Sequence, residues 1–173
     1  MKYISKLFLI FLISMIYAED VIAQSEPVKY QKLPVISNNA LTNYSGENVQ
    51  FSDLYKDGPI LVNFWFLGCA PCVQEMKHLS KFNVKYKDTG FKVISISTDP
   101  DKKESVKKFT KRKKYTFDTL FDNKKKNGVI KKFGSNACPF TALINMDGTF
   151  FSKHTSFTIG DQDMYEKEII EKI

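Results

Sequence analysis

Residues 60–72 read Ile60-Leu61-Val62-Asn63-Phe64-Trp65-Phe66-Leu67-Gly68-Cys69-Ala70-Pro71-Cys72. The run from Ile60 to Phe66 is almost entirely apolar and rich in β-branched and aromatic residues, which predicts a central strand covered on both faces. The two cysteines lie where this strand ends and a helix is expected to begin. Unpaired N–H groups at a helix N-terminus favour the thiolate, the form that attacks disulfides. Because Cys72 follows Cys69 so closely, it can displace a captured partner, and the pair therefore predicts reversible disulfide chemistry.

The length of the chain, 173 residues, is enough for one domain with a hydrophobic core. Hydrophobic residues make up 43% of the chain, which excludes a disordered protein. The formal net charge of +7 is compatible with nucleic acid or an anionic membrane as a partner. The N-terminal segment argues against nucleic acid, so we expect no nucleic acid partner.

Residues 1–23 have the pattern of a secretory signal peptide. Two lysines precede an apolar run, residues 7–17, that is too short for an ordinary membrane span. Cleavage after Ala23 leaves a mature chain of residues 24–173, and cleavage after Ala18 is an alternative. An uncleaved N-terminal anchor is a further alternative. The protein is therefore expected to be exported, in a bacterium to the periplasm, and to be soluble after cleavage or else anchored at its N-terminus.

Export to an oxidising compartment favours paired cysteines, and the chain has three: Cys69, Cys72 and Cys138. A bond between Cys69 and Cys72 closes a loop too small to stabilise the fold much. Such a bond is better suited to being formed and broken repeatedly. Cys138 is left over and needs its own explanation.

Strands and helices alternate along the chain after an extended lead-in, residues 24–43. Strands are predicted at 49–51, 60–66, 91–97, 117–121, 139–146 and 149–154, and helices at 73–87, 102–114, 123–133 and 162–172. A helix between two strands implies parallel pairing, whereas the Asp147-Gly148 turn predicts an antiparallel hairpin. The fold class is therefore α/β, with a central mixed sheet, helices on both faces and an N-terminal β extension. Residues 24–173 are expected to form this single domain.

Two segments together carry a family pattern. Residues 62–76 contain the Cys-Ala-Pro-Cys motif and the glutamate that follows it. In residues 134–148, a proline precedes an apolar strand and an Asp-Gly turn. In both segments the chain resembles the exported thioredoxin-like proteins of the TlpA/ResA family, from about Leu33 to the C-terminus. The resemblance implies a thioredoxin-like fold in which Pro139 follows a cis peptide bond beside the two sulfurs.

The resemblance implies a role for each residue of the motif. Cys69 would be the exposed nucleophile and Cys72 the more buried resolving thiol, while Pro71 stiffens the ring that they close. Glu75 matches an acidic residue of the TlpA/ResA branch and would exchange a proton with Cys72. The alternative is that Glu75 only interacts favourably with the helix dipole.

The resemblance also implies a substrate-binding surface around the disulfide, made of Trp65, Ala70, Pro71, Cys138 and Pro139. Trp65 is expected mainly to pack beside the site. The backbone next to Pro139 would pair with an extended segment of a substrate protein. The alternative for Pro139 is an ordinary proline on an edge strand.

Three residues depart from the family pattern. Asn63 stands where ordinary thioredoxins have a buried aspartate, and asparagine is frequent at this position in TlpA-like proteins. Gly68 replaces the usual tryptophan before the first cysteine, which should open the surface around Cys69. Cys138 precedes the cis-proline, and three interpretations of it stay open: exchange with Cys69, a third metal ligand, or a small apolar side chain.

The expected function is an exported thiol-disulfide oxidoreductase that reduces protein disulfides through a Cys69/Cys72 dithiol-disulfide cycle. The resemblance implies disulfide-containing client proteins and a membrane electron donor of the DsbD/CcdA type. We expect a monomer with no cofactor and no bound metal ion. Cytochrome c maturation is a familiar task of this branch, but no residue of the chain singles it out.

The main alternative is a copper chaperone of the Sco type, with Cys69, Cys72 and His154 as ligands of Cu(I). The motif of Sco-type proteins, Cys-x-x-x-Cys, is one residue longer than the motif here. A peroxiredoxin is a third hypothesis, but it has a threonine three residues before its reactive cysteine, where this chain has Phe66. A non-catalytic binding domain is expected to lack one of the two cysteines, and both are present.

Overall fold

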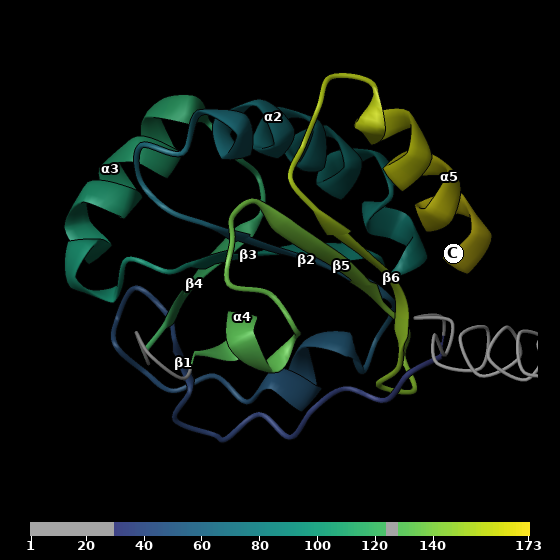
Figure 1. Cartoon of the computed structure of the whole chain (residues 1–173), viewed down its shortest axis with the longest axis horizontal. Helices are drawn as coiled ribbons and strands as arrows, with labels where there is room; N and C mark the ends of the chain where they lie inside the picture. Colours follow the sequence, from purple (N-terminus) through teal and green to yellow (C-terminus); the bar gives the residue numbers. More distant parts are fainter. Residues whose placement is uncertain (1–29, 124–127) are drawn as a thin grey trace, which may run out of the picture.

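The computed structural model describes residues 30–123 and 128–173. The signal peptide expected at 1–23 lies outside these residues, as does the start of the lead-in. Within them, a six-stranded sheet carries helices on both of its faces, as Figure 1 shows. No helix in this part of the chain is both long enough and apolar enough to span a membrane. The predicted α/β class with a mixed central sheet is confirmed.

From β2 onward, the strands and helices follow one another in the predicted order. The strands are β1 (Leu41–Thr42), β2 (Ile60–Trp65), β3 (Lys92–Ser97), β4 (Asp118–Asp122), β5 (Phe140–Ile144) and β6 (Phe150–Thr155). The α-helices are α2 (Ala70–Lys85), α3 (Lys103–Lys113), α4 (Val129–Lys132) and α5 (Asp161–Lys172). Short 3-10 helices are η1 (Phe51–Tyr55), η2 (Lys87–Thr89) and η3 (Pro100–Lys102).

The strand order across the sheet is β1-β4-β3-β2-β5-β6. β2, β3 and β4 are parallel, because α2 and α3 cross over between them. β5 runs antiparallel to β2, with Phe140 opposite Phe64 and Ile144 opposite Ile60. The segment that follows β2 and the segment that precedes β5 therefore meet at the same end of the sheet.

Successive residues of β2 point to opposite faces of the sheet, which divides the core into two layers. Leu61 and Trp65 pack with α2, α3 and α5 on one face, whereas Val62 and Phe64 pack with η1 and α4 on the other. In Figure 1, α2, α3 and α5 lie above the sheet and α4 lies below it. Every residue of β2 is buried, as expected for a strand covered on both sides.

The lead-in contacts both edges of the sheet. The backbone N–H of Tyr30 donates to the carbonyl of Phe150 (2.7 Å), and the N–H of Phe150 donates to the carbonyl of Gln31 (2.8 Å). Further along, β1 pairs with β4 in the antiparallel sense. The predicted N-terminal β extension is therefore confirmed, as a strand of two residues.

The strand predicted at 49–51 is wrong. Phe51 instead begins η1, and its buried ring packs edge-on against Phe133 beneath the sheet. An isolated bridge between Thr42 and Asn48 is the β pairing that remains near this segment. The apolar residues at 49 and 51 alternate because the ring of Phe51 is buried, and a 3-10 turn can bury such a ring as well as a short strand can.

Two helix boundaries also differ from the prediction. α2 begins at Ala70, three residues before the predicted start, because a proline is tolerated in the first helical turn. Val84 near the end of α2 is exposed, because it lies on the outer side of the helix. α4 is shorter than the predicted helix 123–133, and residues 124–127 lie outside the described part of the chain.

β2 and β3 begin where two glycines lie against each other. A Cβ on Gly58 would be 2.3 Å from the carbonyl oxygen of Gly90, and a Cβ on Gly90 would be 2.6 Å from that of Asp57. Gly90 also has a φ of 84°, which residues with a side chain rarely adopt. Because Lys92 N then donates to the Pro59 carbonyl (3.3 Å), this close contact lies at the start of the β2–β3 register.

Gly90→Ala is expected to destabilise the protein more than Gly46→Ala does, by about 1–3 kcal/mol. Both glycines have a φ of 84°, so both substitutions introduce the same backbone strain. No atom lies within 4 Å of a Cβ at Gly46, so the difference reports the steric contact alone. Denaturant unfolding of the two variants measures this difference, and equal losses would contradict the close backbone contact at Gly90.

Candidate active site

Cys69 and Cys72 form a disulfide at the N-terminus of α2, with their Cα atoms 5.3 Å apart. Cys69 is the N-cap residue, and the backbone N–H of Cys72 donates to Cys69 Sγ at 3.3 Å. In the reduced protein, this N–H group and the helix dipole favour a thiolate at Cys69. The N-terminus of the helix therefore stabilises a negative charge on the first sulfur.

The two cysteines differ less in exposure than expected. Cys69 is 4% exposed and Cys72 is 0% exposed. The expectation of an exposed Cys69 is wrong for the disulfide form, because the side chain turns toward Cys72 and joins the apolar cluster that contains Met76. Ala70 and Pro71 are exposed beside it. These two residues, and not the sulfurs, form the accessible surface of the motif.

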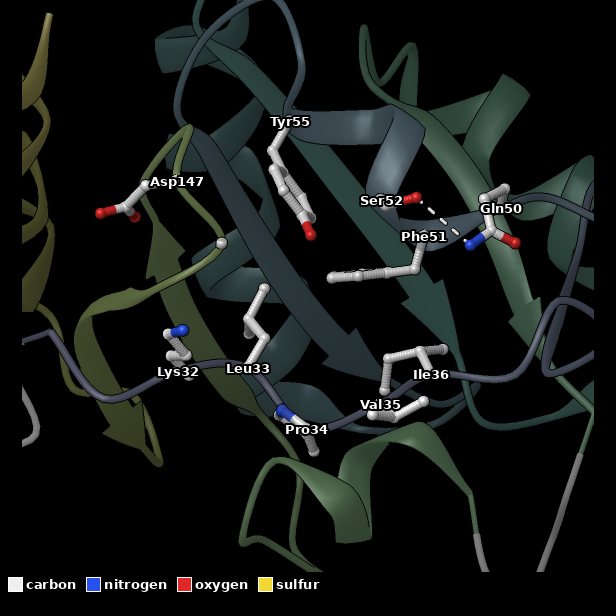
Figure 2. Close-up of a pocket in the computed structure, with 11 residues that line it drawn as sticks. Lys32, Leu33, Pro34, Val35, Ile36, Gln50, Phe51, Ser52, Tyr55 and Asp147 are labelled. Atoms are coloured by element: carbon white, nitrogen blue, oxygen red, sulfur yellow. Dashed lines mark hydrogen bonds between the residues drawn. The ribbon is translucent and has the colours of Figure 1, made fainter.

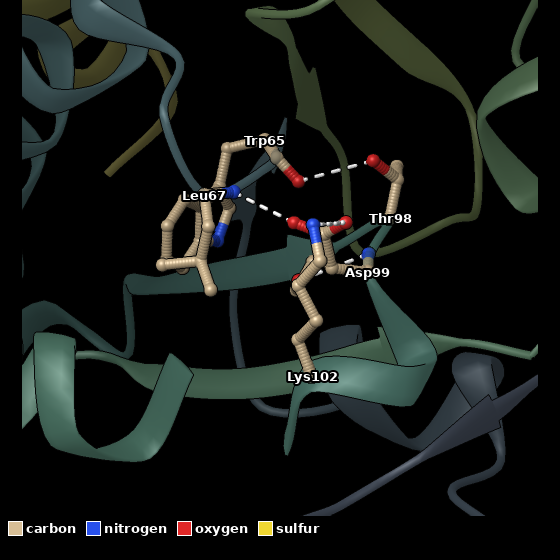
Figure 3. Close-up of polar contacts among 6 residues, drawn as sticks. Trp65, Leu67, Thr98, Asp99 and Lys102 are labelled. Carbon is tan, nitrogen blue, oxygen red and sulfur yellow. Dashed lines mark hydrogen bonds and ion pairs between the residues drawn. The ribbon is translucent and has the colours of Figure 1, made fainter. Parts of the chain in front are cut away.

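A carboxylate from the turn after β3 holds the segment between β2 and Cys69. Asp99 Oδ2 accepts the backbone N–H of Leu67 at 2.7 Å, and Asp99 Oδ1 lies 3.0 Å from Lys102 Nζ (Figure 3). The carbonyl of Trp65 accepts two hydrogen bonds from Thr98, one from its backbone N–H (2.8 Å) and one from its hydroxyl (3.3 Å). These contacts fix the path of the chain immediately before the disulfide.

The peptide bond between Cys138 and Pro139 is cis, as the resemblance implies. Pro139 immediately precedes Phe140, the first residue of β5, and so lies at the same end of the sheet as Cys69. The carbonyl of Pro139 accepts the backbone N–H of Ser156 at 2.9 Å. The structure therefore brings the two segments of the family pattern together at one end of the sheet.

Cys138 is a half-buried free thiol that packs against the core on both faces of the sheet. Burial raises the pKa of this thiol to about 11, and the charges of Glu75 and Asp99 act in the same direction. A thiol with this pKa is almost entirely neutral at pH 7, and the neutral form is unreactive. The surroundings of Cys138 therefore favour the small apolar side chain over the exchanging thiol or the metal ligand.

Glu75 is fully buried on α2, three residues after Cys72. Its Oε1 accepts hydrogen bonds from Thr141 Oγ1 (2.7 Å) and from the Tyr165 hydroxyl (3.0 Å). Its Oε2 accepts a hydrogen bond from Asn63 Nδ2 (2.7 Å), which also donates to Thr141 Oγ1 (3.0 Å). The carboxylate thus receives donors from β2, β5 and α5.

Burial raises the pKa of Glu75 from 4.5 to about 7. The hydrogen bonds from Thr141, Tyr165 and Asn63 oppose this rise, as does the nearby His154. A carboxyl group that titrates near neutral pH can both accept and return a proton. A glutamate that only complemented the helix dipole would lie in solvent, so the geometry favours the proton-transfer interpretation.

Trp65 lies beneath the site and not on the surface open to a substrate protein. Its side chain is fully buried, and its indole N–H donates to Ser95 Oγ at 2.6 Å. The next residue, Phe66, is 41% exposed. Phe66 therefore presents the accessible aromatic ring before the motif, while Trp65 has the packing role expected of it.

His154, the third ligand in the copper hypothesis, is engaged in other contacts. Its Nε2 lies 2.9 Å from Glu168 Oε2, and its ring centroid is 4.9 Å from that of Tyr165. Within residues 30–123 and 128–173, no three His, Cys, Asp or Glu side chains are grouped so that they could hold a metal ion. The structure therefore gives the copper hypothesis no support.

A pocket of 260 Å³ lies at the opposite end of the sheet, between the lead-in, η1 and the β5–β6 turn. Figure 2 shows the side chains of Leu33, Phe51 and Tyr55 pointing into it. Ile60 and Ile144 pair at this end, so the length of β2 separates the pocket from the disulfide. The pocket takes no part in the chemistry of the two cysteines.

Three residues of the site were not predicted from the sequence: Thr141, Tyr165 and Asp99. Thr141 is a polar residue within an otherwise apolar strand, and that pattern is a signal by which it could have been found. Tyr165 is 90 residues from Glu75, in a helix whose buried face accommodates a tyrosine for packing alone. Asp99 lies in a predicted turn, where an aspartate is unremarkable.

Residues 31–152 match the family described as AhpC/TSA. The thiol-disulfide oxidoreductase ResA of Halalkalibacterium halodurans is 31% identical over 118 residues, which cover 68% of this chain and 65% of that protein. The protein of the same name from Bacillus thuringiensis subsp. konkukian is 31% identical over 111 residues and is covered to 62%. The chain thus spans just under two thirds of the length of these curated relatives.

Solved structures with the same fold cover more of the chain. A DsbE-like thiol:disulfide interchange protein from Chlorobium tepidum has a TM-score of 0.71 and 25% identity, over 83% of this chain and 96% of that one. A thiol:disulfide interchange protein from Bacteroides sp. has a TM-score of 0.67 and 27% identity, over 82% and 90% of the two chains. These similarities confirm the predicted thioredoxin-like fold and the resemblance to thiol-disulfide oxidoreductases of the TlpA/ResA kind.

Glu75→Gln is expected to change how stability depends on pH. Because the pKa of Glu75 is higher in the folded protein than its ordinary value of 4.5, the wild type loses stability as the pH rises from 4.5 through 7, and the variant does not. Between pH 4 and pH 8, the free energy of unfolding of the variant should therefore improve relative to that of the wild type by about 3 kcal/mol. Denaturant unfolding of both oxidised proteins at the two pH values measures this change, and parallel pH profiles would show that Glu75 titrates normally.

Proposed function

Because the chain belongs to the AhpC/TSA family, we propose that it is a thiol-disulfide oxidoreductase that works through a Cys69/Cys72 dithiol-disulfide cycle. The observation that carries this proposal is the Cys69–Cys72 disulfide at the N-terminus of α2, with a buried carboxylate three residues further along the same helix. The thiol-disulfide names of the similar proteins agree with it. The partners that this chemistry requires are proteins that contain disulfides.

In the first half of the cycle, the Cys69 thiolate attacks one sulfur of a client disulfide. A mixed disulfide forms between Cys69 and the client, and the other client sulfur leaves as a thiolate that takes up a proton. The N–H of Cys72 and the N-terminus of α2 favour the attacking thiolate.

In the second half, the thiol of Cys72 gives its proton to the carboxylate of Glu75 and attacks the sulfur of Cys69. The bond between Cys69 and the client breaks, and the client sulfur leaves as a thiolate that is protonated. Two electrons have then passed to the client, and the protein carries the Cys69–Cys72 disulfide. Because the pKa of Glu75 is about 7, the carboxyl group can accept this proton and later release it.

We propose that the cycle runs in the reducing direction. The TlpA/ResA-like motif and the buried Glu75 support this direction. The disulfide must then be reduced again after each turnover, and a membrane dithiol donor of the DsbD/CcdA type is the proposed source of the two electrons.

We further propose that residues 1–23 direct export to the periplasm of a bacterium. The charged start, the short apolar run and the small residue at position 23 support a signal peptide. The mature chain, residues 24–173, is proposed to act as a monomer, soluble after cleavage or else anchored at its N-terminus, without a cofactor.

Cys72→Ser retains the attacking thiol but lacks the thiol that releases the client. Expressed in the native host, this variant is expected to accumulate adducts in which Cys69 is disulfide-bonded to a client protein. Dithiothreitol reduces this bond and releases the client. Non-reducing gel electrophoresis followed by mass spectrometry identifies these adducts and hence the client proteins.

Two matched variants assign the adducts to the correct sulfur. Adducts should disappear in the Cys69→Ser/Cys72→Ser double variant and persist in the Cys72→Ser/Cys138→Ala double variant. If Cys72→Ser yields no adducts that depend on Cys69, the exchange mechanism is wrong.

The direction of the cycle is tested by the reduction potential. Equilibration with dithiothreitol or glutathione buffers, followed by alkylation of free thiols, is expected to give a potential toward the reducing value of thioredoxin, about −270 mV. A potential close to about −120 mV, typical of a strong oxidant, would reverse the proposed direction while leaving the exchange chemistry intact.

A further inference from the structure

One of the hydrogen-bond donors to the buried Glu75 carboxylate, the Tyr165 hydroxyl, comes from a helix and not from the sheet. Tyr165 is 1% exposed on α5, and its hydroxyl lies 3.0 Å from Glu75 Oε1. The donors Asn63 and Thr141 occupy paired positions of the adjacent strands β2 and β5, so the sheet register fixes them. The position of Tyr165 depends instead on how α5 packs against the sheet and α2.

Polar contacts join α5 to β6 one helical turn after Tyr165. Glu168 Oε2 accepts a hydrogen bond from Ser152 Oγ at 2.6 Å and lies 2.9 Å from His154 Nε2. The ring of His154 in turn packs against the ring of Tyr165, with centroids 4.9 Å apart. Because these contacts restrict both the helix and the ring, the hydroxyl is held in place before any change of charge at Glu75.

The groups that face Glu75 come from every element packed around it. Asn63 and Thr141 donate from the sheet, His154 on β6 lowers the pKa of Glu75, and the Cys138 thiol lies before β5. Burial raises the pKa of Tyr165, and the charge of Glu75 raises it further. Tyr165 is therefore protonated at every pH at which Glu75 changes charge, so it is always available as a donor.

We propose that Tyr165 is a positioning residue for thiol-disulfide exchange, which orients the carboxylate of Glu75 and stabilises its ionised form so that it can take the proton of Cys72. This inference rests on the proposed function. Without the phenol, Oε1 keeps the hydroxyl of Thr141 as a donor but loses one of its two hydrogen bonds. The charged form of a fully buried carboxylate is then less favourable, so at neutral pH a smaller fraction of Glu75 is ionised and able to accept the proton of Cys72.

The test compares the titration of Glu75 in the wild type and in Tyr165→Phe. The oxidised full-length protein, labelled with ¹³C at the glutamate carboxyl carbons, is titrated by NMR, and Glu75→Gln assigns the resonance. Cys69 and Cys72 do not titrate in this form. The pH at the midpoint of the Glu75 titration is expected to rise by about one unit in Tyr165→Phe. In the reduced protein, the pH at which the release step reaches half its maximal rate should rise by the same amount.

Tyr86→Phe is the matched control. Tyr86 lies beside the C-terminal end of α2, and its hydroxyl donates to Glu166 on α5 at 2.8 Å. This substitution therefore also removes a tyrosine–glutamate hydrogen bond to α5, but not one that touches Glu75. Its Glu75 midpoint should equal that of the wild type. A shift of the same size in both variants would show that general loosening of α5 causes the effect, and would overturn the proposal.

A second variant keeps the proposal testable if Tyr165→Phe does not fold. Tyr165→3-fluorotyrosine, introduced at that single codon, retains the hydroxyl and makes it a stronger donor, so the Glu75 midpoint should fall. An unchanged midpoint in a folded Tyr165 variant would overturn the role assigned to Tyr165. Failure of Cys72→Ser to trap adducts would instead overturn the exchange function, whatever the titration of Glu75 shows.

Discussion

The burial of one carboxyl group, that of Glu75, connects the fold of this protein to its chemistry. An ionisable group without solvent contact is costly unless the surrounding structure supplies donors. Here the donors come from β2, β5 and α5, and the carboxyl group itself comes from α2. The Glu75 carboxylate therefore requires both the register of β2 against β5 and the packing of α5. A shift in either would remove hydrogen-bond donors from a buried charge.

Asn63 and Glu75 form a pair in which an amide replaces one carboxylate and a second position supplies another. Ordinary thioredoxins have a buried aspartate at the position of Asn63, so a proton relay through that position is missing here, and the resemblance assigns proton transfer to Glu75. The structure places the carboxylate of Glu75, 12 residues further along the chain on α2, against Asn63, whose amide donates to it at 2.7 Å. A carboxylate at position 63 would place a second negative charge beside Glu75, so the amide is the side chain that suits this site.

The fold was predictable from local patterns, and the site was predictable only in part. The apolar run of β2, the cysteine motif at a helix start and the proline before β5 each lie within a few residues, so the sequence indicates them directly. Thr141 and Tyr165, which donate to Glu75, are 66 and 90 residues away along the chain. Thr141 stands out only as a polar residue in an apolar strand, and Tyr165 has no pattern of its own that indicates this role. The strand at 49–51 failed for the opposite reason, because a short alternation is compatible with more than one local structure.

The environment of each acid group at the site acts together with its chemical type to determine what the group can do. The helix N-terminus favours a thiolate at Cys69, whereas burial near two negative charges raises the pKa of Cys138 to about 11. Burial also raises the pKa of Glu75, but three donors limit the rise to about 7, within the range in which a group both accepts and releases protons. Desolvation raises the two pKa values by similar amounts, from 9.0 to about 11 for Cys138 and from 4.5 to about 7 for Glu75. Because the ordinary pKa of a carboxyl group is so much lower, the same burial leaves Cys138 a neutral thiol but brings Glu75 to the pH at which it can accept and release a proton.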